Sequence, residues 1–160
     1  MRKVIVILIL IIGLFIFSGC EKKTVVTNDK YAGRGTLNCT REGELEGGEV
    51  SFKYVLDYKD GNILSLHSVE KVVSDDKQLL DEYEKAYKNI FKAYKWLKYY
   101  ENEIIRDDTS VTSDTIIDYK RIDTEALLKI EASSDNIIED GVAKVDKWMT
   151  LAKKFGTTCE

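Results

Sequence analysis

The sequence predicts an α+β fold, in which helices pack on one face of a small antiparallel β-sheet of about four strands. Three patterns lead to this prediction. Apolar and polar residues alternate over residues 50–58, which is the period of a strand with one buried face. Apolar residues recur at helical spacing over residues 79–97, and β-favouring residues return over residues 111–122. Separate runs of strands and helices are typical of α+β domains, and the expected order is β-β-β-α-β-α-α.

The first half of the chain predicts three strands. A short strand runs from Thr36 to about Arg41, and the glycine-broken stretch "EGELEGGE" then turns the chain. Residues 50–59 form the clearest strand of the sequence, because every second side chain is apolar. A third strand is expected over residues 62–73.

The turn between the second and third strands sets their register. Asp60-Gly61 is typical of a tight hairpin turn. A two-residue turn places Leu56 opposite Ser65, whereas a three-residue loop with a left-handed Gly61 places Leu56 opposite Leu64. The second register pairs apolar side chains with each other, so we expect it.

The second half of the chain predicts three helices and a fourth strand. Ser74-Asp75-Asp76 supplies capping side chains and negative charge at a helix start. A long amphipathic helix is expected from there to about Ile105. The later elements are a strand from about Val111 to Ile122, a short helix over Glu125 to Ile130, a last helix over about Asp140 to Phe155, and an extended "TTCE" beside the first strand.

The N-terminus predicts cleavage and lipidation. Met1-Arg2-Lys3 is basic, and residues 4–17 are fourteen uncharged, mostly apolar residues. A helix that spans a bilayer needs roughly 20 apolar residues, so this shorter run is typical of a signal peptide. The stretch "FSGC" resembles a bacterial lipobox, in which the chain is cut before a cysteine that receives diacylglycerol. We therefore expect lipidation of Cys20, and an uncleaved N-terminal anchor is the alternative.

The predicted cleavage divides the chain into three parts. Residues 1–19 are the signal peptide, residues 20–35 are the lipidated cysteine with a flexible tether, and residues 36–160 are a single α+β domain. Without Arg2 and Lys3, 22 basic and 28 acidic residues remain, a net charge of −6. Nucleic-acid binding needs clustered positive charge, so this acidic domain is not expected to bind nucleic acid.

Two cysteines remain once Cys20 is assigned to the lipid. Export places Cys39 and Cys159 outside the cytoplasm, where disulfides persist. We expect them to form a structural disulfide that closes a loop of about 120 residues. Free thiols or a reactive pair are the alternative, although no CxxC motif supports redox chemistry.

The sequence shows no catalytic or metal-binding pattern. His67 is the only histidine, and a metal site needs several ligands. There is no GxSxG nucleophile motif, and the glycines around residues 43–48 form no phosphate-binding loop. We therefore expect no enzymatic activity, no cofactor and no metal site.

A candidate binding patch lies at the end of the long predicted helix. Lysines line its outer face, helical spacing points Trp96 and Tyr99 away from the core, and Tyr100 follows at the helix end. Exposed aromatic residues beside cations are common at interfaces, which favours an anionic partner such as an envelope polymer, a lipid headgroup or a sugar. The alternative is a solvated lysine face whose aromatic residues are covered by the C-terminal helix or a loop. The patch consists of Lys92, Lys95, Trp96, Tyr99 and Tyr100.

Several stretches together resemble the YehR-like family of small bacterial lipoproteins, which are built around a domain of unknown function. They are "FSGC", "LNCTREG", "EVSFKYVLDYKDGNILSLHSVEKV" and "TIIDYKRIDTEALLKI", and the resemblance covers most of residues 37–130. It implies a lipid-anchored α+β domain and supplies no catalytic residues.

The predicted function is that of a cell-envelope lipoprotein acting as a binding module on the extracytoplasmic face of a bacterial membrane. Its expected partners are the membrane, through diacylglycerol and acyl chains such as palmitate on Cys20, and an envelope polymer or protein. Two alternatives remain: a small extracytoplasmic hydrolase or thiol-redox factor, and a structural envelope lipoprotein without a ligand.

Overall fold

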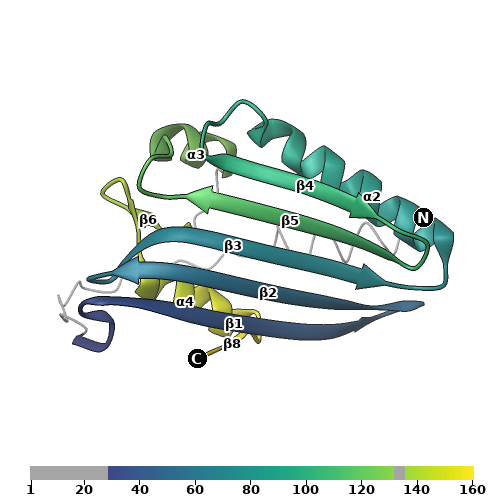
Figure 1. Ribbon diagram of the computed structural model, residues 1–160, viewed down its shortest axis with the longest axis horizontal. Helices are drawn as coiled ribbons and strands as arrows, with labels where there is room; N and C mark the ends of the chain where they lie inside the picture. Colours follow the sequence, from purple (N-terminus) through teal and green to yellow (C-terminus); the bar gives the residue numbers. More distant parts are fainter. Residues whose placement is uncertain (1–28, 132–135) are drawn as a thin grey trace, which may run out of the picture.

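A six-stranded antiparallel sheet forms the centre of the protein (Figure 1). The structure is a computed structural model, and it describes residues 29–131 and 136–160. The strand order is β4-β5-β3-β2-β1-β8, and the helices pack on one face of the sheet, called here the covered face. The α+β class is confirmed, but the sheet has six strands rather than about four. The predicted signal peptide, Cys20 and most of the tether lie outside the described residues.

The element order also differs from the expected β-β-β-α-β-α-α. The strands of the main sheet are β1 (Arg34–Leu45), β2 (Gly48–Lys59), β3 (Asn62–Val73), β4 (Tyr100–Arg106), β5 (Ser110–Asp118) and β8 (Thr158–Cys159). The other elements are η1 (Asp29–Tyr31), α2 (Lys77–Phe91), η2 (Lys92–Tyr94), α3 (Thr124–Glu131), the hairpin β6 (Ile138–Glu139) and β7 (Val142–Ala143), and α4 (Val145–Lys154). Tyr31 of η1 is buried in the core, so the fold begins before residue 36.

The β2–β3 hairpin corrects the predicted register. Lys59 pairs with Asn62, so the turn has two residues, Asp60 and Gly61, with φ of 50° and 76°. Left-handed φ at both positions defines the turn type whose twist matches antiparallel strands. An irregularity beyond Asp57 shifts the pairing, so Leu56 lies opposite Leu66 rather than Leu64. The bulge thus pairs apolar side chains by a route that the turn alone does not predict.

Substitution of Gly61 tests the conformation of this turn. A Cβ at Gly61 would meet no atom within 4 Å, so Gly61→Ala is opposed only by the left-handed backbone. We expect a loss of about 1–2 kcal/mol in the free energy of unfolding, measured by denaturant titration. Gly43→Ala is the control, because its nearest contact would be an ordinary 3.4 Å from Val50, and a change within about 0.5 kcal/mol is expected. Equal losses in both variants would contradict the turn assignment.

The predicted long helix is wrong beyond residue 91. Asp76 caps α2 as expected, accepting hydrogen bonds from the backbone N–H groups of Gln78 and Leu79. The helix ends at Phe91, and after η2 and a left-handed Tyr99 (φ 68°) the chain forms β4. β4 pairs with β5 across a tight connection, and this hairpin is the sheet edge nearest α2 (Figure 1).

The C-terminal region contains a second correction and a confirmed expectation. The last helix begins at Val145 instead of Asp140, because Asp140 and Gly141 (φ 52° and 76°) turn the small β6–β7 hairpin. After α4 the chain extends as β8 and pairs with β1, as predicted for "TTCE". Cys39 lies directly opposite Cys159 and forms a disulfide with it. Cys39 is 1% exposed, so this bridge is part of the core.

Candidate functional site

The connection from α2 to β4, residues 92–99, forms an exposed basic-aromatic loop. Its sequence, KAYKWLKY, contains three lysines and no acidic residue. Leu97 is 5% exposed and holds the loop to the core, and its backbone N–H donates to the carbonyl of Tyr94. Trp96 beside it is 64% exposed, the largest exposure among the large apolar residues that the structure describes as exposed. The core contact of Leu97 therefore presents the Trp96 indole to solvent.

The structure separates the two tyrosines of the predicted patch. Tyr99 is 41% exposed, and the guanidinium of Arg121 lies 4.3 Å from the centre of its ring. Arg121 is held there by Asp118, which accepts a hydrogen bond from Nε at 2.7 Å. Tyr100 turns to the covered face and stacks on Tyr94 with ring centroids 4.6 Å apart. Burial raises the pKa of Tyr100 far above its usual range, as expected for a phenol in the core.

The surface patch therefore comprises Lys92, Lys95, Trp96 and Tyr99, joined by Arg121, while Tyr100 belongs to the core. Lys92 and Lys95 are exposed, as expected for an outer face. Sequence reasoning missed Arg121, because it follows β5 and reaches the loop only through the β4–β5 pairing. The neighbouring pair Tyr99–Arg121 is a cation–π contact.

The second surface feature is the open face of the sheet, opposite the helices. His67 of β3 lies there, with Nε2 2.9 Å from a carboxylate oxygen of Asp114 on β5. Exposed Val55 and Ile116 pair with His67 on its two sides. Within residues 29–131 and 136–160, no group of three or more acidic, histidine or cysteine side chains is placed to hold a metal ion.

The third feature is a polar band that crosses the covered face between two separate hydrophobic clusters. One cluster lies under α3 and α4 around Leu56 and Leu127, and the other lies under α2 around Val72 and Leu80. Polar side chains occupy the strand positions between them. They are Ser68, Glu70, Asn102, Ser113 and Thr115, of which Asn102 donates to the hydroxyls of Ser113 and Thr115 at 3.1 and 2.8 Å.

Glu70 is the charged member of this band. Burial raises the pKa of its carboxyl above the usual 4.5, and the nearby Arg41 only partly opposes this effect. Among the residues that the structure describes, none hydrogen-bonds the Glu70 carboxyl. The guanidinium of Arg41 instead lies 3.8 Å from the centre of the Phe52 ring and donates to the carbonyl of Phe155. Glu70 is thus a partly buried carboxyl whose negative charge Arg41 only partly offsets.

Glu70→Gln should stabilise the protein at neutral pH. The folded state holds the Glu70 proton more tightly than the unfolded chain, so wild-type stability falls as pH rises above about 4.5 towards the raised folded pKa. Glutamine carries no titratable proton, so the stability of Glu70→Gln does not fall over this pH range. We expect it to be more stable by at least about 1 kcal/mol at pH 7 and equal to wild type at pH 4, measured by denaturant unfolding. Exposed Glu103→Gln is the control, and a destabilised Glu70→Gln would contradict the account.

A shallow depression lies between the start of α2 and the β4–β5 turn. It measures about 470 Å³ and is lined by Lys77, Asp81, Arg106, Asp107 and Asp108. Arg106 donates to Asp81 at 3.5 Å and to the carbonyl of Ser110 at 3.4 Å, so its charge is already partnered. Asp107 accepts three hydrogen bonds that close the β4–β5 turn and lower the pKa of its carboxyl. This depression is built from groups that hold the hairpin and the helix together.

Helices in the described part of the chain are all too short or too polar to cross a bilayer.

No known protein-family profile matches the chain, and no curated protein sequence matches it. Two solved structures are similar. The NMR structure of a protein from Streptococcus pneumoniae TIGR4 has a TM-score of 0.49 at 20% identity, over 92% of each chain. The NMR structure of the E. coli YehR protein has a TM-score of 0.54 at 19% identity, over 79% of this chain and 92% of YehR, so the chain shares the fold of E. coli YehR.

Proposed function

We propose that the protein is a YehR-like lipoprotein, anchored by Cys20 to the extracytoplasmic face of a bacterial membrane, whose domain binds an anionic partner. The lipobox-like "FSGC" supports the anchoring, and the fold shared with E. coli YehR supports the resemblance to the YehR-like family. A disulfide between Cys39 and Cys159 suits an oxidising compartment.

The observation that carries the binding proposal is Trp96, 64% exposed within a loop of three lysines and no acid. A large aromatic side chain left in water favours a partner that covers it. The lysines beside Trp96 favour a negatively charged partner, because charges across an interface are usually complementary. Their positive charge contrasts with the acidic character of the whole chain. We propose that the patch binds its partner without catalysis.

Fluorescence of Trp96 tests this function. The chain has two tryptophans, so Trp148→Phe leaves Trp96 as the only reporter. We expect polyphosphate or dextran sulfate, added as soluble polyanions, to shift or quench its emission, and neutral dextran to leave it unchanged. Lys92→Glu/Lys95→Glu should abolish the response.

The matched control for this titration is Lys71→Glu/Lys77→Glu, which makes the same charge change at two exposed positions away from the loop. It should retain the response. Emission that ignores both polyanions, or an equal loss in the two double variants, would contradict binding through the basic-aromatic loop.

A further inference from the structure

The basic-aromatic loop and the start of the described chain lie at the same end of the sheet. The register pairs Arg34 of β1 with Lys59 of β2, and Lys59 with Asn62 of β3. β5 ends at this same end, and Tyr100, the first residue of β4, pairs with Ile117 near the end of β5. The loop immediately precedes Tyr100, and the described chain enters immediately before β1. We call this end the tether end.

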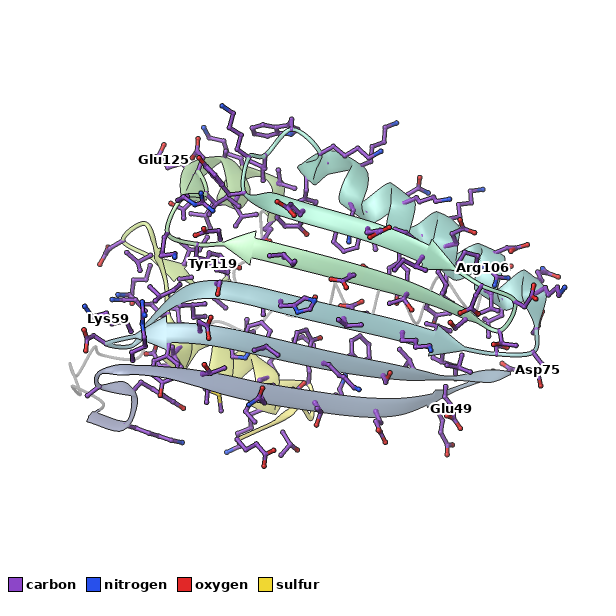
Figure 2. The ribbon with its side chains drawn as sticks, viewed as in Figure 1. Glu49, Lys59, Asp75, Arg106, Tyr119 and Glu125 are labelled. Atoms are coloured by element: carbon purple, nitrogen blue, oxygen red, sulfur yellow. A yellow bond between two sulfur atoms is a disulfide. The ribbon has the colours of Figure 1, made fainter. Side chains whose placement is uncertain are left out.

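The opposite end of the sheet is strongly acidic. Residues 42–49, which comprise the end of β1, the turn and the start of β2, contain four glutamates and no basic residue. Asp75 and Asp76 at the start of α2 and Asp107-Asp108 between β4 and β5 lie at the same end. Figure 2 shows this separation along the strands, with Glu49 and Asp75 at one end of the sheet and Lys59 and Glu125 at the other.

The tether end carries mixed charges outside the loop, and several of its acids are engaged. Asp118 binds Arg121, and Asp60 accepts a hydrogen bond from the backbone N–H of Gly33 at 2.8 Å. The lysines of the loop have no acidic neighbour within residues 92–99. The tether end therefore carries the three lysines and the exposed tryptophan of the loop, while the glutamate-rich turn lies at the other end of the strands.

The length of the N-terminal segment limits how far the tether end can be from the anchor. Asp29 lies nine positions after Cys20, and a fully extended chain of that length spans at most about 30 Å. A strand of twelve residues, such as β1, is itself about 40 Å long. If Cys20 is at the bilayer, the tether end is therefore held near the headgroups, at the millimolar effective concentration typical of short linkers.

We propose that the basic-aromatic loop docks on anionic phospholipid headgroups of the same membrane, so that the domain stands on its tether end with the glutamate-rich end directed away. This inference rests on the proposed anchoring at Cys20 and names the partner of the loop. Lysine side chains are attracted to anionic headgroups, and tryptophan and tyrosine prefer the interface between headgroups and hydrocarbon. Repulsion of the acidic end from the same surface favours the same orientation.

Lipid-attached quenchers test this orientation in the lipidated mature protein. The Trp148→Phe form is reconstituted into vesicles that carry a nitroxide on the headgroup, made either with phosphatidylglycerol or with phosphatidylcholine alone. We expect strong quenching of Trp96 in the anionic vesicles and weak quenching in the neutral ones. The difference in quenching should shrink at about 1 M salt, because the attraction between lysines and headgroups is then screened over about 3 Å. A difference spectrum between wild type and Trp96→Phe gives the same readout without altering Trp148.

Charge variants separate the possible outcomes. Lys92→Glu/Lys95→Glu should reduce quenching in anionic vesicles at least about fivefold, whereas Lys71→Glu/Lys77→Glu should leave it unchanged. Equal quenching in neutral and anionic vesicles, or equal effects of the two double variants, would overturn the docking while leaving the anchor intact. A chain that carries no lipid and does not enter the vesicles would overturn the anchor, and the docking with it. A loop that responds to soluble polyanions but not to the vesicles would point to an envelope polymer instead and overturn the membrane docking.

Discussion

Loss of the Cys39–Cys159 disulfide should lower the free energy of unfolding by about 4–5 kcal/mol. The bridge closes a loop of 120 residues, and a closure of that size removes much of the freedom of the unfolded chain. It also fastens β8 to β1, whose pairing is otherwise short: two residue pairs and the backbone hydrogen bonds between Asn38 and Glu160. Guanidinium unfolding of wild type with and without reductant measures the loss, as a lower midpoint with a steeper slope, because the unfolded chain without the bridge exposes more surface.

The double variant Cys39→Ala/Cys159→Ala is the control for this measurement. It should be about as unstable as reduced wild type, to within the small cost of the substitution itself, and should not respond to reductant, because no other disulfide joins described residues. Alanine at the buried position 39 also leaves a small void, so a further loss of about 1 kcal/mol is expected. A midpoint that reductant does not move would contradict a structural role for the bridge.

Cys20→Ala should transfer the protein from the membrane to the soluble fraction. A single acyl chain binds a membrane only marginally, so durable anchoring requires the multiple chains of a lipidated cysteine. The basic-aromatic loop alone then provides too little affinity to retain the domain. Fractionation of cells with detection of the protein, combined with metabolic labelling by a palmitate analogue, measures both the location and the lipid.

Ser18→Ala is the matched control for this substitution, because alanine keeps a small side chain before the predicted cleavage site. It should remain labelled and membrane-bound. Retention of Cys20→Ala in the membrane would favour the alternative of an uncleaved N-terminal anchor.

The strands with a clean alternation could be predicted from the sequence, and β4 shows why others could not. The covered face of β4 carries Asn102, and its open face carries Ile105, so apolar and polar residues no longer alternate cleanly. The tyrosines and Leu97 preceding β4 instead continue the helical spacing of α2 past its end at Phe91. Pairing with β5 and the turn at Asp107 decide the structure there, and both depend on contacts outside the local sequence.

The two Asp-Gly turns differed in how well the sequence predicted them. Asp60-Gly61 indicated a hairpin because long alternating runs flank it, whereas Asp140-Gly141 was assigned to a helix start because β6 and β7 are only two residues each. Both pairs adopt the same left-handed backbone. The register of the first hairpin also needed the bulge beyond Asp57, which no turn residue specifies.

The lysines and Trp96 of the candidate site could be predicted from the sequence, but not which neighbouring residues belong to it. Tyr100 was predicted to belong to the patch, yet as the first residue of β4 it faces the core. Arg121 joined the loop through strand pairing alone. The polar band around Glu70 was not predicted, because strand position 70 continues the inward phase of Leu66 and Val72 and an apolar residue is expected there.

The mass of the protein extracted from membranes tests the central claim most directly. If the protein is a lipid-anchored domain, intact mass spectrometry should show a chain that begins at Cys20, carries the added mass of diacylglycerol, and loses two hydrogens to the Cys39–Cys159 disulfide. A mass equal to the unmodified chain of residues 1–160, or to a shorter chain without lipid, would contradict it.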